Sequence, residues 1–451
     1  MLEQEEKDLT VECVRMALVA GAQKARASLN KNNMNIVATL DGEVDRISAC
    51  LDRSISLNLF VDGRYGSFST NKLEREALRS FIGKAVGTVR MLAEDLDRDL
   101  PGKERTATDA VTGRELGIYD DSFREFGPQR RIDEALRNCF REKSEKGWKL
   151  VSEEGEWSDS ESFNFIADSD GLRALHSETS FEFFDEVTIE DSEGNKFTGG
   201  WWEAAPLLKD FHPEKVAPAA LREAVMQIGP RPCRSGKYRM VLDSEVSSKV
   251  FSPILNALNA FSIQQKNSFM VDSLGKRVFP GGLDIMDIPR TEGQACGKMF
   301  DSEGVATSNH YIIKDGKVQE YFVNTYMSNK LDLPPTIEDA TRPVILPWLS
   351  PAFDKGIAHG DKDAIMALCG EGIYVTDFCG GNCNSATGDF SYAIQGYRFK
   401  DGAIVHPVRE MLITGNLIKL WAGLIAAGND ARPCRAKLTP TLAFEGVDFS
   451  G

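Results

Sequence analysis

Histidine, the side chain best suited to bind a catalytic metal, is rare in this sequence. Its five histidines are His176, His212, His310, His359 and His406. A hydrolytic zinc site needs imidazoles that converge from one element and an open position for water. None of the five is followed by glutamate, and no two are close enough in sequence to form a ligand pair on one helix. The sequence therefore predicts no catalytic zinc in this chain.

The nine cysteines are scattered over the 451 residues. Cys379 and Cys383 have a spacing that could clip a metal, but no second pair follows at the spacing of a zinc ribbon. Cys369 precedes this pair, and Cys434 stands alone near the C-terminus. We interpret all four as structural thiols, with metal binding as the open alternative. An odd, dispersed set is not typical of a disulfide framework, so we expect reduced thiols and a cytoplasmic protein.

Other catalytic patterns are weak. His406 and Glu410 are four residues apart, but Pro407 lies between them in a strand-like run, so the two side chains need not share a face. Neither a Gly-x-Ser-x-Gly elbow nor a Gly-x-x-x-x-Gly-Lys phosphate loop is present. We expect Gly380-Gly381 to form a turn first, and a point of close backbone approach second.

The elements that would position these residues indicate an α+β fold. Residues 1–100 are predicted to form an N-terminal domain, a helix–antiparallel meander–helix unit. Residues 1–30 are expected to be helical, and short alternating runs predict strands at 35–40, 44–51 and 56–61. Asp41-Gly42 and Asp62-Gly63 are pairs that type I′ hairpin turns favour.

Two further regions follow in this prediction. Residues 101–232 form a middle α+β region, in which the acidic, serine-rich stretch 153–161 is interpreted as a solvated loop, with an acidic interaction patch as the alternative. Residues 233–451 form a strand-rich C-terminal domain. Near its end, residues 417–425 predict a short amphipathic helix whose Trp421 belongs to the core or, alternatively, to a subunit contact.

The charge balance limits the partners. The net charge is -15, from 68 acidic and 53 basic residues, and such a field repels a phosphate backbone. We therefore expect no direct binding of nucleic acid. No window approaches the roughly 18 apolar residues of a membrane span, so no membrane association is expected. The acidic, polar start does not match a secretory signal, which again favours the cytoplasm.

Several short strings, in order along the chain, resemble the TldD/TldE (PmbA) family. They are residues 61–70 (VDGRYGSFST), 300–305 (FDSEGV), 387–391 (TGDFS), 406–411 (HPVREM), 413–417 (ITGNL) and 428–430 (GND). Each string alone is weak, but their order and spacing cover nearly the whole chain. The last four resemble the TldE/PmbA-type subunit, so the resemblance implies the C-terminal fold of this family.

The resemblance also implies an activity and its metal. The family trims or degrades small, partly unfolded peptides, and members form pairs of related subunits around a cavity. The TldD-type subunit binds zinc through His-Glu-x-x-x-His on a helix and a later cysteine, and its glutamate deprotonates the zinc-bound water. Extended peptides commonly dock on sheet edges, which this strand-rich chain would offer.

In the helix expected after Leu242, an approximate alignment places Asn256, Ala257 and Phe261 at the His, Glu and His positions of that motif. Cys434 falls roughly where the cysteine ligand would be. An amide, a methyl group and a phenyl ring cannot bind and activate a metal-bound water. The resemblance thus implies a non-catalytic subunit without a cofactor of its own, and zinc in a TldD-like partner.

Two other functions stay open from the sequence. The chain could be a self-sufficient metallopeptidase that acts as a homodimer, in which case it would hold zinc itself. It could instead regulate DNA gyrase, as an early name of the family implies. The acidic composition argues against direct contact with DNA in that role.

Overall fold

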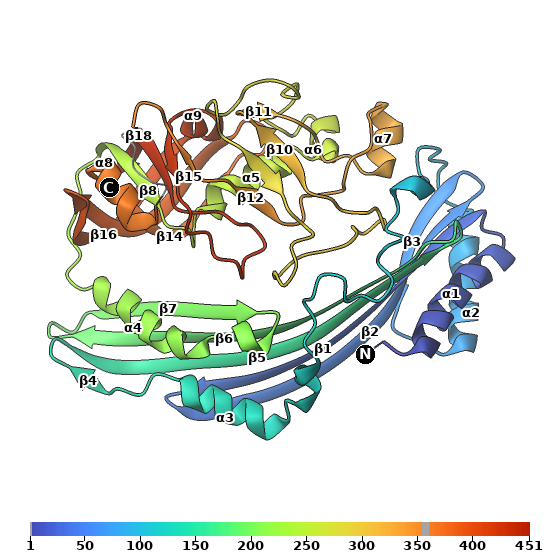
Figure 1. Ribbon diagram of the computed structural model, residues 1–451, viewed down its shortest axis with the longest axis horizontal. Coiled ribbons are helices and arrows are strands. Elements are labelled where there is room, and N and C mark those ends of the chain that lie inside the picture. The colour runs from blue at the N-terminus through green and yellow to red at the C-terminus, as the bar shows by residue number, and fades with distance from the viewer. Residues whose placement is uncertain (1, 354–359) are drawn as a thin grey trace. The chain divides into compact units, whose positions relative to one another are not determined.

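The computed structural model describes residues 2–353 and 360–451 and divides into two compact units (Figure 1). The first unit comprises Met1–Met226, Arg290–Thr307 and Ser328–Asp332, and the second comprises the remaining segments, Gln227–Pro289, Ser308–Met327 and Leu333–Gly451. Both units mix helices with sheets, so the predicted α+β class is confirmed. The finer division at residues 100 and 232 stays a prediction.

A single sheet of seven strands organises the first unit, in the order β3-β2-β1-β5-β6-β7, with β4 paired to β5. The strands are β1 (Lys24–Leu40), β2 (Glu43–Val61), β3 (Arg64–Thr70), β4 (Ser144–Glu145), β5 (Trp148–Asp168), β6 (Arg173–Asp191) and β7 (Lys196–Ala205). All neighbours are antiparallel. Figure 1 shows β1, β2, β5 and β6 running side by side as long curved strands.

The two faces of this sheet differ in chemistry, because side chains alternate between them along each strand. One face is apolar and covered by helices. At one end α1 (Gln4–Val19) and α2 (Arg75–Val89) pack on side chains such as Leu29. At the other end α3 (Pro128–Asn138) and α4 (Val216–Met226) contribute to the cluster around Trp157, Phe181 and Phe183.

The opposite face carries polar side chains. Asn164 donates a hydrogen bond to Asn30 at 2.6 Å, and Ser162 donates one to Asn32 at 2.9 Å, both between β5 and β1. These hydrogen bonds lie on the polar face of the sheet, and the opposite face of the same strands packs into the core. The alternation explains why long strands here contain so many Ser and Asn residues.

The hairpin turns are confirmed. Asp41 and Gly42 have φ values of 53° and 79°, and Asp62 and Gly63 have 50° and 70°. Two consecutive residues with positive φ define the type I′ turn, which Asp-Gly adopts with little strain. These turns join β1 to β2 and β2 to β3.

Other expectations for the first unit were wrong. The first helix ends at Val19 rather than near residue 30, because Gly21 takes φ 106° and the chain enters β1. The short strands are parts of two continuous strands of 17 and 19 residues. The acidic stretch 153–161 is not a loop but the middle of β5, where the odd-numbered residues, including Glu153, Asp159 and Glu161, are buried and the even-numbered residues face the other side.

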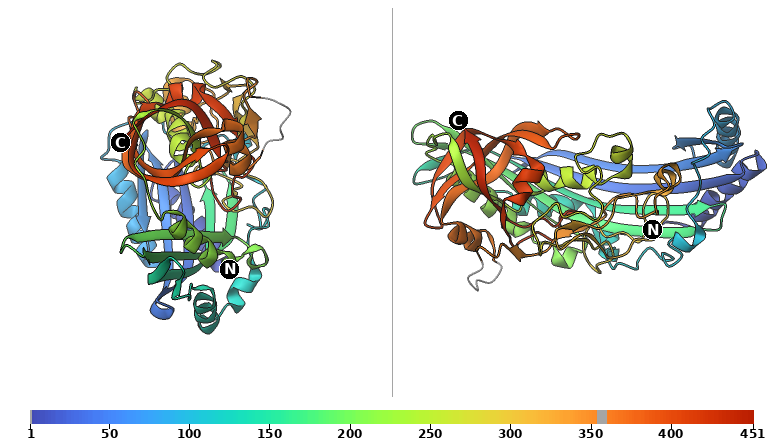
Figure 2. Two further views of the ribbon diagram at one scale, coloured as in Figure 1. Left: turned by 90° about the vertical axis from the view of Figure 1, so that its left-hand side faces the viewer. Right: turned by 90° about the horizontal axis from the view of Figure 1, so that it is seen from above.

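The second unit is strand-rich, as predicted. Its larger sheet has the order β13-β17-β18-β16-β15-β14-β8, and its smaller sheet β11-β10-β9-β12. The larger sheet comprises β8 (Gly236–Leu242), β13 (Trp348–Leu349), β14 (Glu371–Cys383), β15 (Asp389–Lys400), β16 (Ala403–Asn416), β17 (Leu424–Ala427) and β18 (Leu442–Ser450). The smaller comprises β9 (Ile285–Asp287), β10 (His310–Lys314), β11 (Lys317–Val318) and β12 (Pro343–Ile345). Because β8 pairs with both β14 and β18, five strands close into a ring (Figure 2, left).

Several helices accompany these sheets. They are α5 (Ser248–Ala257), α6 (Ala260–Gln264), α8 (Lys362–Cys369) and α9 (Leu417–Ala422). A further helix, α7 (Thr325–Leu331), is divided between the units, because Ser328–Asp332 belongs to the first. The predicted helix 417–425 is thus too long, because Leu424 and Ile425 belong to β17. Trp421 is fully buried against Phe444 and donates a hydrogen bond to the Val250 carbonyl at 3.2 Å, so its core role is confirmed. Among the described residues, no helix is both long and apolar enough to cross a membrane.

Candidate functional site

The three motif positions lie around a break between two helices. Asn256 and Ala257 form the last turn of α5, whereas Phe261 belongs to the first turn of α6. Asn259 makes the break, because its side chain accepts a hydrogen bond from the Phe261 backbone N–H at 2.9 Å and so caps α6. The expectation that these positions share one helix is therefore wrong.

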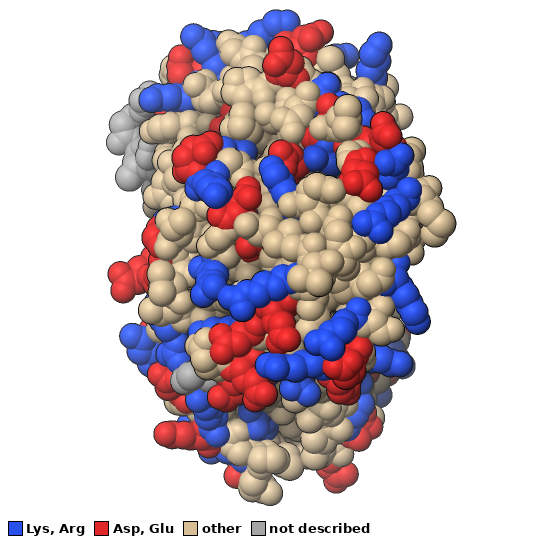
Figure 3. Space-filling view, turned by 90° about the vertical axis from the view of Figure 1, so that its right-hand side faces the viewer, with Lys and Arg blue, Asp and Glu red and all other residues tan. Residues whose placement is uncertain are grey.

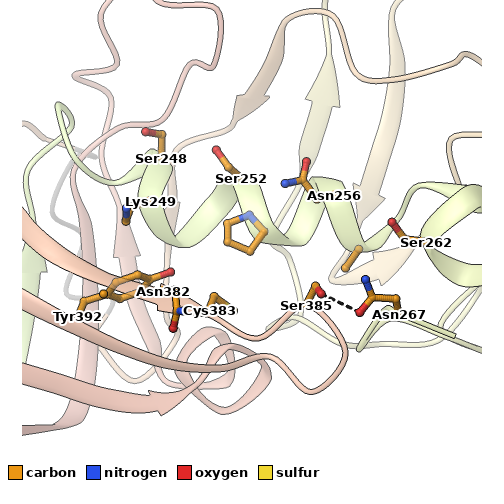
Figure 4. A pocket seen from close by; sticks show the side chains of 13 residues that line it. Ser248, Lys249, Ser252, Asn256, Ser262, Asn267, Asn382, Cys383, Ser385 and Tyr392 are labelled. Carbon is orange, nitrogen blue, oxygen red and sulfur yellow. Dashed lines mark hydrogen bonds between the residues drawn. The ribbon is translucent and has the colours of Figure 1, made fainter. Parts of the chain in front are cut away.

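A pocket of ≈ 420 Å³ lies beside α5 in the second unit. Ser248, Ser252 and Asn256 line it at four-residue spacing along the helix, which places them on one side, as Figure 4 shows. Ala257 also lines it. Phe261 does not belong to the lining and is 49% exposed, so the structure brings only two of the three motif positions to this pocket.

The facing wall comes from the end of β14, the turn after it and β15. It consists of Gly381, Asn382, Cys383, Ser385 and Tyr392. Ser385 donates a hydrogen bond to the Asn267 side chain at 2.8 Å (dashed in Figure 4), which ties this turn to the chain segment after α6.

Gly381 is required at its position in β14. It takes φ +97°, and a Cβ atom built there would lie 2.0 Å from the Ser391 carbonyl oxygen. The close backbone approach predicted for Gly380-Gly381 is therefore confirmed at Gly381 but not at Gly380, where a Cβ atom would meet nothing within 4 Å. The predicted turn is wrong, since β14 continues to Cys383.

The pocket offers hydrogen bonds rather than acid–base groups. Lys249 is the one charged side chain among the described residues that line it, and its Nζ lies 5.4 Å from the centre of the Tyr392 ring. Burial, and the nearby charge of Asp389, raise the pKa of the Cys383 thiol. Burial, and the neighbouring Cys383, raise the pKa of Tyr392 to about 12. Both groups are therefore protonated near neutral pH, and neither is an activated nucleophile.

The side chains at the motif positions do not fit a zinc ion. An amide replaces the first imidazole, a methyl group replaces the carboxylate, and an outward phenyl ring replaces the second imidazole. Zinc in proteins is held by thiolate, imidazole and carboxylate groups. Over residues 2–353 and 360–451, no three His, Cys, Asp or Glu side chains gather closely enough to hold a metal.

Cys434 lies apart from the pocket lining. It is half-buried and stands between Arg432 and Arg435, which both form ion pairs with Glu245. Its surroundings are thus a cluster of charged side chains that precede α5 and follow β17. The metal-ligand role weighed for Cys434 stays a prediction.

The other cysteines of interest divide between surface and core. Cys379 is exposed on β14, and its sulfur accepts a hydrogen bond from Gln395 at 3.0 Å. Cys383 lines the pocket, and Cys369 is buried at the end of α8. Burial raises the pKa of Cys369 to about 12, which fits the structural role predicted for it.

The described histidines do not lie close to one another. His176, His212 and His310 each have one glutamate within 3.5 Å, namely Glu178, Glu214 and Glu320. His406 contacts the Pro407 carbonyl oxygen at 3.0 Å on β16, and Glu410, on the same strand, takes φ 59°. His359 lies outside the described residues.

The sequence alone did not reveal the polar lining of the pocket. A polar stripe at four-residue spacing, Ser248, Ser252 and Asn256, stands out on a helix whose other residues are mostly apolar. This pattern is the signal from which the helix side of the lining could have been predicted. The facing residues Asn382, Ser385 and Tyr392 carry no comparable pattern, because strand pairing rather than sequence distance brings them opposite α5.

A chain with this fold and these domains has known relatives. Residues 235–451 match the PmbA/TldA metallopeptidase C-terminal domain, and residues 122–228 match the PmbA/TldA metallopeptidase central domain. The crystal structure of a proposed DNA gyrase modulator from Bacteroides thetaiotaomicron is 33% identical, covers 100% of both chains and superposes with a TM-score of 0.92. The chain therefore belongs to the PmbA/TldD family.

More distant relatives agree with this family. Metalloprotease PmbA of Escherichia coli O157:H7 is 25% identical over 452 residues, which cover 98% of this chain and 97% of that protein. The crystal structure of TldE from Thermococcus kodakarensis is 14% identical, covers 98% of this chain and 100% of that one, and has a TM-score of 0.80. At that identity the likeness to TldE extends to the fold alone.

Proposed function

We propose that this chain is the non-catalytic, TldE/PmbA-like subunit of a zinc metallopeptidase that trims or degrades small unfolded peptides. The observation that carries the proposal is the chemistry at the motif positions, where Asn256, Ala257 and Phe261 replace two imidazoles and a carboxylate. The partner is a TldD-like paralogue with His-Glu-x-x-x-His, and the zinc belongs to that partner. This chain contributes shape and hydrogen bonds to the cavity.

The pocket beside α5 supports a role in holding a peptide. Its serine and asparagine side chains donate and accept hydrogen bonds, and an extended peptide presents unpaired N–H and C=O groups to such surfaces. A volume of ≈ 420 Å³ is within the range of small-ligand sites and suits a short stretch of extended chain. Because Lys249 is the one charged lining residue among those described, a carboxylate in the peptide would be favoured near it.

Co-expression tests the subunit role. The chain is co-expressed with a paralogue from the same genome that carries His-Glu-x-x-x-His, and only one of the two carries an affinity tag. The two chains should co-purify, and the complex should cleave unstructured peptides that this chain alone leaves intact. Robust peptide cleavage by this chain alone, or no association with the paralogue, would contradict the proposal.

A bulky substitution tests the pocket. Ser252→Trp should fill it and raise the KM of the complex for peptides, with the zinc content of the partner unchanged. Gln265→Trp is the matched control, because Gln265 is exposed and is not part of the lining. Equal KM values for both variants and the unmodified complex would exclude a peptide-binding role for this pocket.

A further inference from the structure

A second pocket, of ≈ 330 Å³, lies on the polar face of the sheet in the first unit. Six polar side chains of its lining share this face, because strand residues two apart point to the same side. The strand register arranges them in two rows across β1, β5 and β6, namely Asn30, Asn164 and His176 in one row and Asn32, Ser162 and Glu178 in the other. Residues of the segment 298–302, which belongs to the same unit, also line it. We call this cavity the sheet pocket.

The sheet pocket is enclosed at β6 and open at β1. The His176 side chain on β6 is only 11% exposed, whereas Asn30 and Asn32 on β1 are exposed residues. Phe300 is buried, and its ring meets the imidazole of His176 edge-on, with 6.5 Å between the ring centres. A ligand would therefore enter over β1 and place one of its ends at β6.

The enclosed end holds an ionised carboxylate and an unsatisfied ring nitrogen. His176 Nε2 is buried, lies 3.5 Å from a carboxylate oxygen of Glu178, and has no hydrogen-bond partner among the residues that the structure describes. Burial raises the pKa of Glu178, but the neighbouring His176 and Lys298 lower it by more, so this carboxylate is charged at neutral pH. Buried polar atoms in proteins nearly always have a partner, so this end favours a ligand group that donates hydrogen bonds to it.

The open end supplies hydrogen-bond donors instead. The bonds that Asn164 and Ser162 donate occupy the carbonyl oxygens of Asn30 and Asn32. The amide NH₂ groups of these two asparagines remain, and the described part of the chain offers them no partner. Lys298 adds an exposed ammonium group to the lining, and no carboxylate pairs with it within residues 2–353 and 360–451. The sheet pocket thus has acceptors at its enclosed end and donors at its mouth.

This order of groups fits the amino end of an amino acid or of a peptide. An α-ammonium group has three N–H donors, and these match the acceptors at the enclosed end, the Glu178 carboxylate and the free amide oxygen of Asn164. The carbonyl or carboxylate beside the ammonium group would then accept from the donors at the mouth, Asn30, Asn32 and Lys298. An anionic group in the reverse orientation would be repelled by Glu178, and a neutral one would leave its charge unpaired.

We propose that the sheet pocket binds the α-ammonium end of a free amino acid or short peptide, with the ammonium group at Glu178 and the adjacent carbonyl at Asn30 and Asn32. A volume of ≈ 330 Å³ is at the small end of the range for ligand sites and suits one or two residues. The sheet pocket shares no described lining residue with the pocket beside α5. The inference is therefore independent of the proposed subunit role, and its failure would leave the zinc and co-purification results unchanged.

Calorimetric titration of the purified full chain with small probes at neutral pH tests the proposal. The dipeptide Ala-Ala should bind, and N-acetyl-Ala-Ala, which has no ammonium group, should bind at least about tenfold more weakly. Putrescine, which has ammonium groups but no carbonyl, should also bind at least about tenfold more weakly. If either of these two probes bound as tightly as Ala-Ala, the proposal would be overturned.

Free alanine distinguishes the two sources of the ligand. Alanine that binds at least as tightly as Ala-Ala would identify a site for free amino acids, and tighter binding of Ala-Ala would identify a site for the amino end of a peptide. Both results support the shared chemistry of the site. A chain that binds neither probe would overturn it.

A charge-removing variant locates the ammonium group. Glu178→Gln keeps the shape of the side chain and should weaken Ala-Ala binding by at least about tenfold. Glu186→Gln is the matched control, because Glu186 lies on the same face of β6 outside the lining and its loss of charge should leave the affinity unchanged. If Ser252→Trp abolished the binding and Glu178→Gln did not, the ligand would occupy the pocket beside α5 and the proposal would be wrong. Thermal unfolding of each variant separates a lost contact from a lost fold.

Nuclear magnetic resonance of chain with labelled histidine rings locates the ligand without a change of charge. The ring signals of His176, assigned through the His176→Gln variant, should shift as Ala-Ala is added. His212 is the internal control, because its side chain is 52% exposed and does not line the sheet pocket, so its signals should stay in place. A His176 signal that does not move when Ala-Ala saturates the chain would contradict the proposed site.

Discussion

Glu153 on β5 and Asp185 on β6 place two carboxyl groups in hydrogen-bond contact inside the first unit, with both side chains fully buried. The Gly42 N–H donates to Glu153 at 2.9 Å, and the Phe140 N–H donates to Asp185 at 3.1 Å. Burial first, and the charge of Glu153 second, raise the pKa of Asp185 to about 8. Burial also raises the pKa of Glu153, so near neutral pH the pair holds a proton.

This pair predicts how stability depends on pH. Because the pKa of Asp185 is about 8 in the folded chain and 3.8 ordinarily, the folded chain binds more protons than the unfolded chain between these values. The stabilisation that comes from protonated Asp185 is complete below about pH 4 and is lost as pH rises through about 8. Asp185→Asn should remove this dependence of stability on pH. At alkaline pH it should raise the free energy of unfolding by roughly 2 kcal/mol, and the melting temperature with it.

Thermal unfolding over this pH range measures the effect. Glu186→Gln is the matched control, because Glu186 is the next residue on β6 and faces the other side of the sheet. It should keep the pH profile of the unmodified chain. An Asp185→Asn variant with that same profile would show that the pair does not titrate as described.

A buried ion pair should matter for stability. Arg131 of α3 donates two hydrogen bonds to Asp159 of β5, at 2.7 Å and 2.8 Å, and Trp157 donates a third at 2.9 Å. Arg131→Ala would leave the carboxylate buried without its cation and should cost about 3 kcal/mol in urea unfolding. Arg137→Ala removes an exposed pair from the same helix and should cost less than about 1 kcal/mol. Similar losses in both variants would contradict this account of the first unit.

Alkylation should distinguish the thiol in the pocket from one at the surface. The raised pKa of Cys383 keeps its thiol protonated, and only the thiolate reacts with iodoacetamide. Cys383 should therefore be alkylated more slowly than the exposed Cys50, and more slowly still when a peptide occupies the pocket of the complex. Mass spectrometry of labelled fragments measures both rates. If Cys383 reacted as fast as Cys50 and bound peptide did not protect it, the peptide would not bind in this pocket.

Direct binding to DNA is not expected. On the face shown in Figure 3, Lys and Arg side chains are interspersed with Asp and Glu rather than gathered into one broad basic region. With a net charge of -15, the chain has little drive from counterion release. A filter-binding assay at low salt should show only weak retention of duplex DNA, and tight, salt-sensitive binding would revive a role at the DNA.

The sequence predicted the turns of this fold better than its long strands. Asp41-Gly42 was readable because type I′ turns need positive φ at two successive residues. The stretch 153–161 was not, since its Glu and Asp side chains resemble a solvated loop until partners such as Arg131 and Thr39 satisfy them in the interior. Such partners lie far away in sequence, and local composition does not identify them.

The candidate site was predictable in part. Asn256 and Ala257 were located by resemblance and do line a pocket, whereas Phe261 does not, because the Asn259 cap divides the expected helix. Asn382 and Tyr392 became visible only in the structure, since the pairing of β14 with β15 brings them opposite α5.

The measurement that tests the central claim most directly is the zinc content of the purified chain, determined by mass spectrometry of the metal after expression without the paralogue. We predict far less than one zinc per chain, and nearly one zinc per pair once the TldD-like subunit is bound. Near-stoichiometric zinc in this chain alone, together with peptide cleavage that a chelator abolishes, would contradict the account.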